Sequence, residues 1–133
     1  MSAVLINVNG CPDPKTVTPS ARPPAAMAEP VVVAALGDSL TAGYGLPTEQ
    51  GFVPVMEDWL NENGAEVKLR NAGVSGDTTA GGLSRVDWTL TDDVEALIVE
   101  LGGNDLLRGV PPATSRENLD GILQAAEAKG LPV

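Results

Sequence analysis

Short apolar runs alternate with amphipathic segments from residue 31 onward, and this alternation predicts three strand-helix units. The runs at 31–36 and 96–101 are almost entirely apolar, which is typical of strands buried on both faces of a parallel sheet. Residues 66–70 instead alternate polar with apolar side chains, which indicates an outer strand with one wetter face. The order of strands and helices therefore predicts an α/β fold, with helices on both faces of a parallel sheet.

The first predicted helix covers residues 53–63, where apolar side chains recur at helical spacing. Those that gather on one face are Phe52, Val55, Met56, Trp59 and Leu60. Gly64 stands where a helix normally ends, because glycine adopts the left-handed conformation of a helix terminus without strain.

Two further helices are expected after the second and third strands. Residues 78–90 form the next helix, although Gly81-Gly82 weakens its first turns. Thr114 and Glu117 have the spacing of a capping box in front of the last helix, which Gly130 ends.

The first 29 residues differ from the rest of the chain. They are rich in proline and poor in large apolar side chains, which predicts a disordered arm or a degenerate signal segment before a folded domain at 30–133. Ala26-Met27-Ala28 is similar to the end of a secretory signal. The export signal is incomplete, however, because it has no basic start and no apolar run longer than residues 3–6.

Leu131-Pro132-Val133 has the pattern of the first residues of a fourth strand, so the sheet is expected to be incomplete at the C-terminus. With the third strand at the edge, the backbone groups of Leu97, Ile98 and Val99 would lack partners. We therefore expect self-association through an uncovered sheet edge, or completion of the sheet by a partner.

The charge balance narrows the range of partners. The chain has 8 Lys and Arg against 18 Asp and Glu, a net charge of -10, which repels nucleic acid and anionic lipid. It has no His and one Cys, so neither a metal site nor a cofactor is expected. No apolar stretch reaches the roughly 20 residues of a transmembrane helix, so we expect no membrane-spanning segment.

Each predicted strand is followed by an unusual polar cluster. The clusters are Gly37-Asp38-Ser39-Leu40, residues 71–78 and Gly102-Gly103-Asn104-Asp105. Because the carboxyl ends of parallel strands meet at one edge of a sheet, the three clusters are expected to share one rim, where ligands bind in such folds.

Each cluster has a catalytic and a plain structural interpretation. Ser39 is a candidate nucleophile or an ordinary cap or turn serine. The N–H of Gly76 is a candidate oxyanion donor, or part of a turn in which Asp77 or Thr78 caps the next helix. The side-chain amide of Asn104 is another candidate oxyanion donor, or belongs to a left-handed turn residue.

Residues 37–46 and 99–109, with Gly76-Asp77-Thr78 between them, resemble the first three sequence blocks of the GDSL/SGNH hydrolases. The likeness is greatest to the bacterial arylesterase, acyl-CoA thioesterase and lysophospholipase branch, and it covers residues 31–133. The resemblance implies a three-layer doubly wound parallel sheet, the flavodoxin-like fold of these hydrolases, incomplete at its C-terminus.

The resemblance also implies a reaction. Ser39 would form an acyl-enzyme, and the N–H groups of Ser39 and Gly76 with the amide of Asn104 would form the oxyanion hole. Asp38 would be a structural turn residue. The substrate would be a small-molecule carboxyl ester or thioester.

The base that the resemblance requires is missing from this sequence. In the family a His, oriented by an Asp three residues earlier, activates the serine, and this chain has neither that Asp-x-x-His block nor any His. A serine hydroxyl is a weak nucleophile until a base takes its proton. Unperturbed carboxylates such as those of Glu100 and Asp105 titrate near pH 4, too low for effective base work. We therefore expect the chain to be inactive alone.

Three further questions stay open at the level of sequence. Tyr44, Leu46, Leu106 and Val110 either line an acyl site or are ordinary loop-packing residues. The absent His favours an alternative function, a non-catalytic module of the same fold that binds an acyl or carbohydrate ligand. The branch implies a periplasmic or secreted protein, while the incomplete signal keeps a cytoplasmic location open. Nucleotide binding is not indicated, because no glycine-rich phosphate motif follows the first strand.

Overall fold

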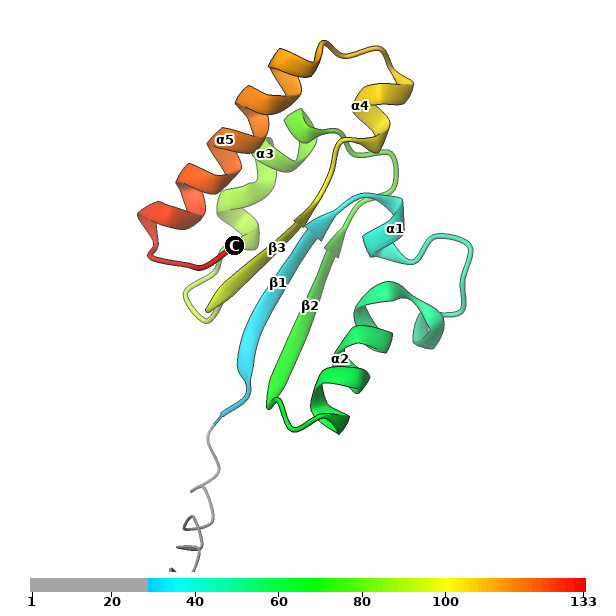
Figure 1. Ribbon diagram of the computed structural model, residues 1–133, viewed down its shortest axis with the longest axis vertical. Helices are drawn as coiled ribbons and strands as arrows, with labels where there is room; N and C mark the ends of the chain where they lie inside the picture. The colour runs from blue at the N-terminus through cyan, green and yellow to red at the C-terminus, as the bar shows by residue number, and fades with distance from the viewer. Residues whose placement is uncertain (1–28) are drawn as a thin grey trace, which may run out of the picture.

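A computed structural model describes residues 29–133, in which a parallel sheet lies between two layers of helices (Figure 1). The elements are β1 (Val31–Gly37), α1 (Ser39–Ala42), the 3₁₀ helix η1 (Thr48–Gln50), α2 (Phe52–Glu62), β2 (Val67–Gly73), α3 (Thr79–Thr89), β3 (Ala96–Glu100), α4 (Gly103–Leu107) and α5 (Pro112–Ala128). This order confirms the predicted α/β fold. All but the last residue of the predicted arm, 1–29, lies outside the described residues.

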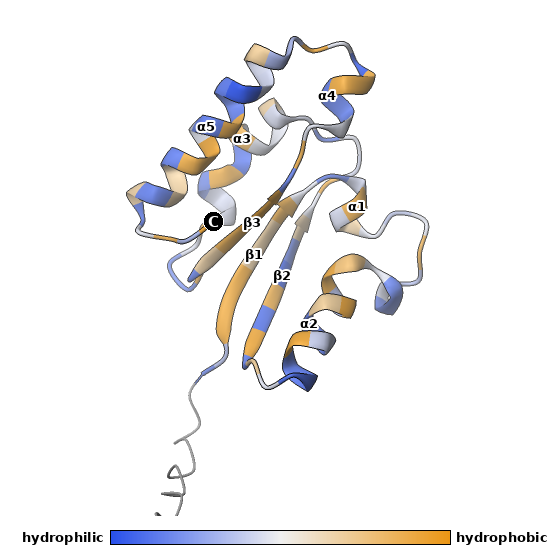
Figure 2. Cartoon of the chain, in the orientation of Figure 1, coloured by the Kyte–Doolittle hydropathy of each residue, from blue (hydrophilic) through white to orange (hydrophobic). Residues whose placement is uncertain are grey.

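The sheet has the strand order β2-β1-β3, and both neighbouring pairs are parallel. β1 is central, and its Ala34, Ala35 and Leu36 are fully buried, as predicted for a strand covered on both faces. β2 is an edge strand, and polar positions interrupt its apolar colour in Figure 2. This confirms the outer position that its alternating sequence predicts.

The helices bury two separate cores against the sheet. One core lies under α3 and α5, and its buried members are Ala34, Leu36, Val86, Leu90, Val94, Leu97, Ile122 and Ala126. The other lies under α2, and its buried members are Ala35, Val53 and Leu69. Alternate residues of β1 therefore supply opposite faces, as the two-residue period of a strand requires.

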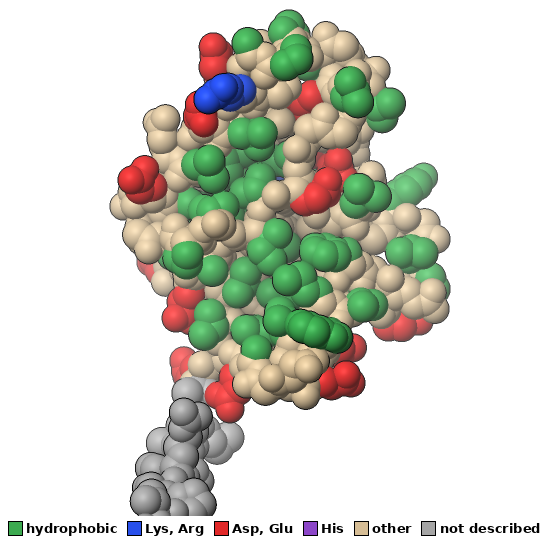
Figure 3. Space-filling view, viewed as in Figure 1, with side chains coloured by type: hydrophobic (Ala, Val, Ile, Leu, Met, Phe, Trp, Pro, Cys, Tyr) green, Lys and Arg blue, Asp and Glu red, His purple; other side chains and the backbone are tan. Residues whose placement is uncertain are grey.

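The apolar stripe predicted on α2 forms, but most of it stays on the surface. Phe52, Val55 and Trp59 are 45%, 52% and 61% exposed, whereas Val53 is the buried residue of this helix. In Figure 3 hydrophobic side chains gather on the visible face of the molecule instead of being covered. The periodicity identified the helix correctly, but not how much of its apolar face is packed.

The end of the chain lies beside β3, but residues 131–133 form no fourth strand of the described sheet. The Leu97 N–H donates a hydrogen bond of 2.9 Å to the Pro132 carbonyl. The expectation that Leu97 lacks a backbone partner is therefore wrong, because residues after α5 turn back beside the strand. β3 is still an edge of the sheet formed by strands β1, β2 and β3.

The start of α5 also corrects an expectation. The helix begins at Pro112, and its N-cap, Pro111, makes no side-chain capping bond, so Thr114 and Glu117 lie inside the helix and form no capping box. Proline favours the first position of a helix because its fixed φ suits the helix and its missing N–H leaves nothing unpaired. Gly130 follows the helix with a φ of 69°, as expected.

The two glycines that weaken the start of α3 are explained by close packing. A Cβ at Gly81 would lie 1.8 Å from an Asp77 carboxylate oxygen, and one at Gly82 would lie 2.3 Å from Leu101. Thr78 caps this helix by accepting a hydrogen bond from the Gly81 N–H, one of the two predicted caps. Among the described helices, none has the length and apolar character needed to cross a membrane.

Candidate active site

The turn after β1 is built by a buried carboxylate and a close helix. Asp38 is 3% exposed and caps α1 by accepting the Leu40 N–H at 2.9 Å. A Cβ at Gly37 would lie 2.0 Å from the Thr41 hydroxyl, so glycine is needed where α1 packs on the strand end. Ser39 is the first residue of α1 and is half-buried; Asp38, not Ser39, is therefore the capping residue here.

The turn after β2 brings a second cluster beside the first. The Val74 N–H donates to the Gly37 carbonyl at 2.9 Å, which joins this turn to the end of β1. Gly76 has a φ of 81°, a conformation that favours glycine, and its carbonyl accepts a 2.7 Å hydrogen bond from Arg108. The turn is thus fixed from both sides.

The third cluster joins the other two through one side chain. Asn104 is the second residue of α4 and not a left-handed turn residue; the N-cap of this helix is Gly102, whose φ is 125°. Its amide nitrogen donates to Asp38 Oδ2 at 3.1 Å and to the Asp77 carbonyl at 2.8 Å. Asn104 therefore contacts both the residue before Ser39 and the residue after Gly76.

Two backbone donors at this rim are free. Within residues 29–133, the N–H groups of Ser39 and Gly76 donate no backbone hydrogen bond. Ser39, Gly76 and Asn104 are all half-buried. The rim therefore offers a hydroxyl and unpaired N–H donors to a small ligand.

A buried carboxylate stabilises the base of the third cluster. Asp105 is 2% exposed and accepts the Thr79 N–H at 2.8 Å, the Thr79 hydroxyl at 2.5 Å and the Ser115 hydroxyl at 3.0 Å. Burial alone would raise the pKa of Asp105, but these hydrogen bonds outweigh it and hold the pKa below its ordinary value. Asp105 thus ties α4 to α3 and α5.

Glu100, at the end of β3, has the opposite electrostatic character. Burial raises the pKa of Glu100, and the charge of Asp38 raises it further, although the hydrogen bond from the Thr41 hydroxyl at 3.1 Å opposes the rise.

The described residues contain no group of three or more Asp, Glu, Cys or His side chains that could hold a metal ion.

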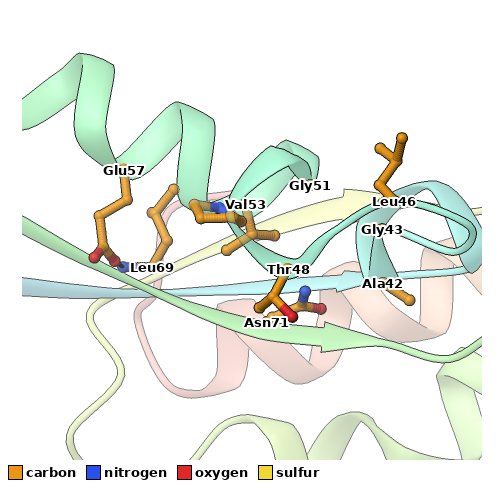
Figure 4. Close-up of a pocket in the computed structure, with 10 residues that line it drawn as sticks. Ala42, Gly43, Leu46, Thr48, Gly51, Val53, Glu57, Leu69 and Asn71 are labelled. Atoms are coloured by element: carbon orange, nitrogen blue, oxygen red, sulfur yellow. Dashed lines mark hydrogen bonds between the residues drawn. The ribbon is translucent and has the colours of Figure 1, made fainter.

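The four predicted substrate contacts line two different cavities or lie on the surface. Leu46 lines a cavity of about 280 Å³ between α1, η1, α2 and β2, with Glu57 and Asn71 among its polar walls (Figure 4). Leu106 and Val110 line a different, mostly apolar groove of about 510 Å³ between α4 and α5. Tyr44 is 79% exposed. The role of these four residues as substrate contacts stays a prediction.

The sequence did not predict that two arginines, Arg85 and Arg108, contact the rim. Arg108 contacts the Gly76 carbonyl, and Arg85 contacts the Asp77 carboxylate and the carbonyls of Ala72 and Gly37. Both act on backbone oxygens, which carry no sequence signal. A sequence signal for the Arg85–Asp77 pair does exist. The two residues are eight positions apart, about two helical turns, the spacing at which residues share one side of a helix.

Comparison with known proteins adds evidence on ancestry. A model of the GDSL-like lipase/acylhydrolase family matches residues 35–133. Esterase TesA of Pseudomonas aeruginosa is 46% identical over 99 residues, which cover 74% of this chain and 49% of that protein. A protein of Escherichia coli K12 named thioesterase 1/protease 1/lysophospholipase L1 is 38% identical over 95 residues, which cover 70% and 44% respectively. The chain spans about half the length of these curated relatives.

Two solved structures share the fold. AlinE4, an SGNH-hydrolase family esterase, superposes with a TM-score of 0.77 at 48% identity, covering 80% of this chain and 58% of that one. Esterase EstA from Pseudoalteromonas sp., in a structure inhibited by monoethylphosphonate, superposes with a TM-score of 0.70 at 35% identity, covering 75% and 55%.

Proposed function

Because the chain belongs to the GDSL-like lipase/acylhydrolase family, we propose that it carries the nucleophile and oxyanion-binding part of a serine ester hydrolase. Ser39 is the nucleophile, and the N–H groups of Ser39 and Gly76 with the Asn104 amide stabilise the oxyanion. One observation supports this most strongly: Asn104 donates to both Asp38 and Asp77, which bring Ser39 and Gly76 to the same rim.

The proposed reaction is acyl transfer. Ser39 Oγ bonds to the carbonyl carbon of an ester or thioester, the carbonyl electron pair moves onto oxygen, and the hydroxyl proton passes to a base. The C–O or C–S bond then breaks, the leaving group takes a proton, and water releases the acyl group from Ser39 by the same steps. Hydrogen-bond donors already aimed at the developing oxyanion lower the barrier.

The Asn104 amide already donates two hydrogen bonds within the protein before any substrate binds. Both of its hydrogens already have protein acceptors, Asp77 O at 2.8 Å and Asp38 Oδ2 at 3.1 Å. We expect the oxyanion to compete for the hydrogen in the longer bond, while the shorter bond keeps the amide in place. The Ser39 and Gly76 N–H groups need no such exchange.

The general base must come from outside these 133 residues, because the chain has no His. We therefore propose that the chain by itself hydrolyses p-nitrophenyl acetate negligibly. Turnover of this ester by the purified chain, lost in Ser39→Ala, would contradict the proposal. Hydrolysis at the same rate by wild type, by Ser39→Ala and in buffer without protein would support it.

The half-site itself can be tested by intact-mass analysis after exposure to a fluorophosphonate. Ser39 Oγ bonds to phosphorus and fluoride leaves, so each reacted chain gains one phosphonyl group. Imidazole added to the buffer supplies a base close in pKa to a free His. We expect an adduct that forms faster with imidazole and never in Ser39→Ala. Absence of the adduct even with imidazole would overturn the proposal.

The absent His also supports a second candidate function, a module that binds an acyl or carbohydrate ligand without turnover. This candidate is favoured if the chain forms no phosphonyl adduct but binds octanoate or an oligosaccharide in a calorimetric titration. An adduct at Ser39 favours the hydrolase. The periplasmic or secreted location remains a proposal that rests on the family resemblance.

A further inference from the structure

The Arg85 side chain reaches from α3 to both strand ends that carry the proposed oxyanion donors. Its Nη1 donates to the Ala72 carbonyl at 2.7 Å, near the end of β2, and its Nη2 donates to the Gly37 carbonyl at 3.0 Å, at the end of β1. Its Nε donates to Asp77 Oδ2 at 2.7 Å. One planar group therefore joins the end of β1 to the stretch 72–77, two segments that are far apart in sequence.

Two of the three contacts, those to Gly37 and Asp77, are one or two residues from a proposed oxyanion donor. Gly37 lies two residues before Ser39, and Asp77 follows Gly76 directly. Asp77 also offers its carbonyl to the Asn104 amide at 2.8 Å. A shift of Arg85 would therefore reach all three donors through short stretches of backbone.

The environment of Arg85 favours a fixed position. Its side chain is 23% exposed and that of Asp77 is 14% exposed. The Asp77 carboxylate packs against the backbone of Gly81, where a Cβ would lie 1.8 Å from its oxygen. A charge-assisted bond in such a site is stronger and better defined than one on the surface.

We infer that Arg85 is a positioning residue for the oxyanion hole: it holds the ends of β1 and β2 and the Asp77 turn so that the Ser39 and Gly76 N–H groups converge. This inference rests on the proposed function for its effect on rate, but its effect on geometry can be measured separately. A Lys at this position keeps the charge but offers a point-like ammonium, which cannot reproduce the fork geometry of the three bonds.

The test uses the 133-residue chain with Arg85→Lys and Arg85→Met, and Arg70→Met as a matched control. Arg70 also pairs with an aspartate, Asp93, but that pair is 41% and 56% exposed. We expect the rate of Ser39 phosphonylation in imidazole buffer to fall roughly tenfold to a hundredfold in both Arg85 variants, because a displacement near 1 Å has that effect on catalysis. The control should stay within about twofold.

A second readout separates geometry from reactivity. In ¹⁵N-¹H spectra, the backbone amide of Gly76 and the side-chain amide of Asn104 should shift in Arg85→Lys and stay in place in Arg70→Met. Wild-type rate and unshifted amides in a folded Arg85→Lys chain would overturn the inference. If wild type itself forms no adduct, the proposed function fails, whereas the amide shifts still decide the role of Arg85.

A third variant, which removes the charge pair and keeps Arg85, tests the inference even if both Arg85 variants fail to fold. If neither Arg85 variant folds, as judged by circular dichroism, Asp77→Asn removes the carboxylate and leaves the bonds to Ala72 and Gly37. We expect it to slow phosphonylation by a smaller factor than the one set out for the Arg85 variants, and to shift the same two amides. No shift and an unchanged rate in Asp77→Asn would contradict the positioning role.

Discussion

The two faces of the sheet are built to different degrees. Under α3 and α5, eight buried residues form one continuous core, and Leu36, Leu90 and Ile122 are fully buried. Under α2 only three residues are buried, and Trp59 on the same helix is 61% exposed. The face under α3 and α5 thus has the larger buried core, while the face under α2 buries fewer residues and leaves much of its helix's apolar surface exposed.

This difference matters for the rim because its parts rest on different faces. Asp105 joins α4 to Thr79 of α3 and Ser115 of α5, on the well-packed face. Ser39 begins α1, which lies on the same face of the sheet as α2 (Figure 1). We call this the thinner face, because only three residues are buried under α2. We therefore expect the Asn104 side of the site to be held more firmly than the Ser39 side.

The largest effect is expected for Ile122→Ala in the well-packed core. Ile122 is fully buried, so the change removes buried methyl groups and leaves a cavity, with a loss of about 2–5 kcal/mol in the free energy of unfolding. Urea denaturation of the purified chain measures it. A loss below about 1 kcal/mol would mean that this face is as loosely packed as the other.

The next effect is expected for Asp105→Asn, which tests the anchor on the same face. Its pKa is lowered in the fold, so the charged form contributes stability above the unfolded pKa, near 4, and this is lost as pH falls through the folded pKa. We expect a loss of about 1–3 kcal/mol at pH 7, because Thr79 and Ser115 lose charged acceptors. The stability of Asp105→Asn should also fall less steeply than wild type below pH 4.

Glu100→Gln is a control for the pH dependence of stability, because the pKa of Glu100 is raised in the fold whereas that of Asp105 is lowered. Burial raises the pKa of Glu100, so its contribution is greatest below the unfolded pKa and is lost as pH rises through the folded pKa. The urea midpoint of Glu100→Gln should therefore match or exceed wild type at pH 7. A lower midpoint at pH 7 with an unchanged acid limb would show that the sign is wrong.

A smaller effect is expected on the thinner face for Val53→Ala. Val53 is 4% exposed, and removing two buried methyl groups costs about 1–2 kcal/mol at roughly 0.8 kcal/mol each. The measurement is again the urea midpoint, compared with that of Ile122→Ala in the same buffer. Equal losses for the two variants would remove the distinction between the faces.

The smallest effect is expected for Trp59→Gln, on the exposed stripe of α2. A surface substitution of this kind changes stability by no more than about 0.5 kcal/mol. Because 61% of this side chain faces solvent, the variant should also be more soluble than wild type. A loss above 1 kcal/mol would show that Trp59 is packed in solution, for example against another chain.

The sequence predicts what hydrophobic periodicity and glycine positions encode. The buried strand at Val31–Gly37 and the end of α2 before Gly64 both follow from local patterns. It could not predict how far α2 is covered, because exposure of Phe52 and Val55 depends on what lies beside the helix. It also missed α4, whose five residues are too few to show a period.

The site shows the same division. The positions of Ser39, Gly76 and Asn104 at one rim follow from parallel strands that end at the same edge. The contacts of Arg85 and Arg108 could not be predicted, because their acceptors are mostly carbonyl oxygens present at every residue. The double use of the Asn104 amide was also out of reach, because it depends on distances of a few tenths of an ångström.

The most direct test of the central claim is a crystal structure of the chain with Ser39 phosphonylated. The phosphonyl oxygen mimics the oxyanion, and we expect it to lie about 2.7–3.1 Å from the Ser39 N, the Gly76 N and Asn104 Nδ2. An adduct whose oxygen points to solvent, with Gly76 and Asn104 out of hydrogen-bond reach, would contradict the claim that these three residues form one oxyanion hole.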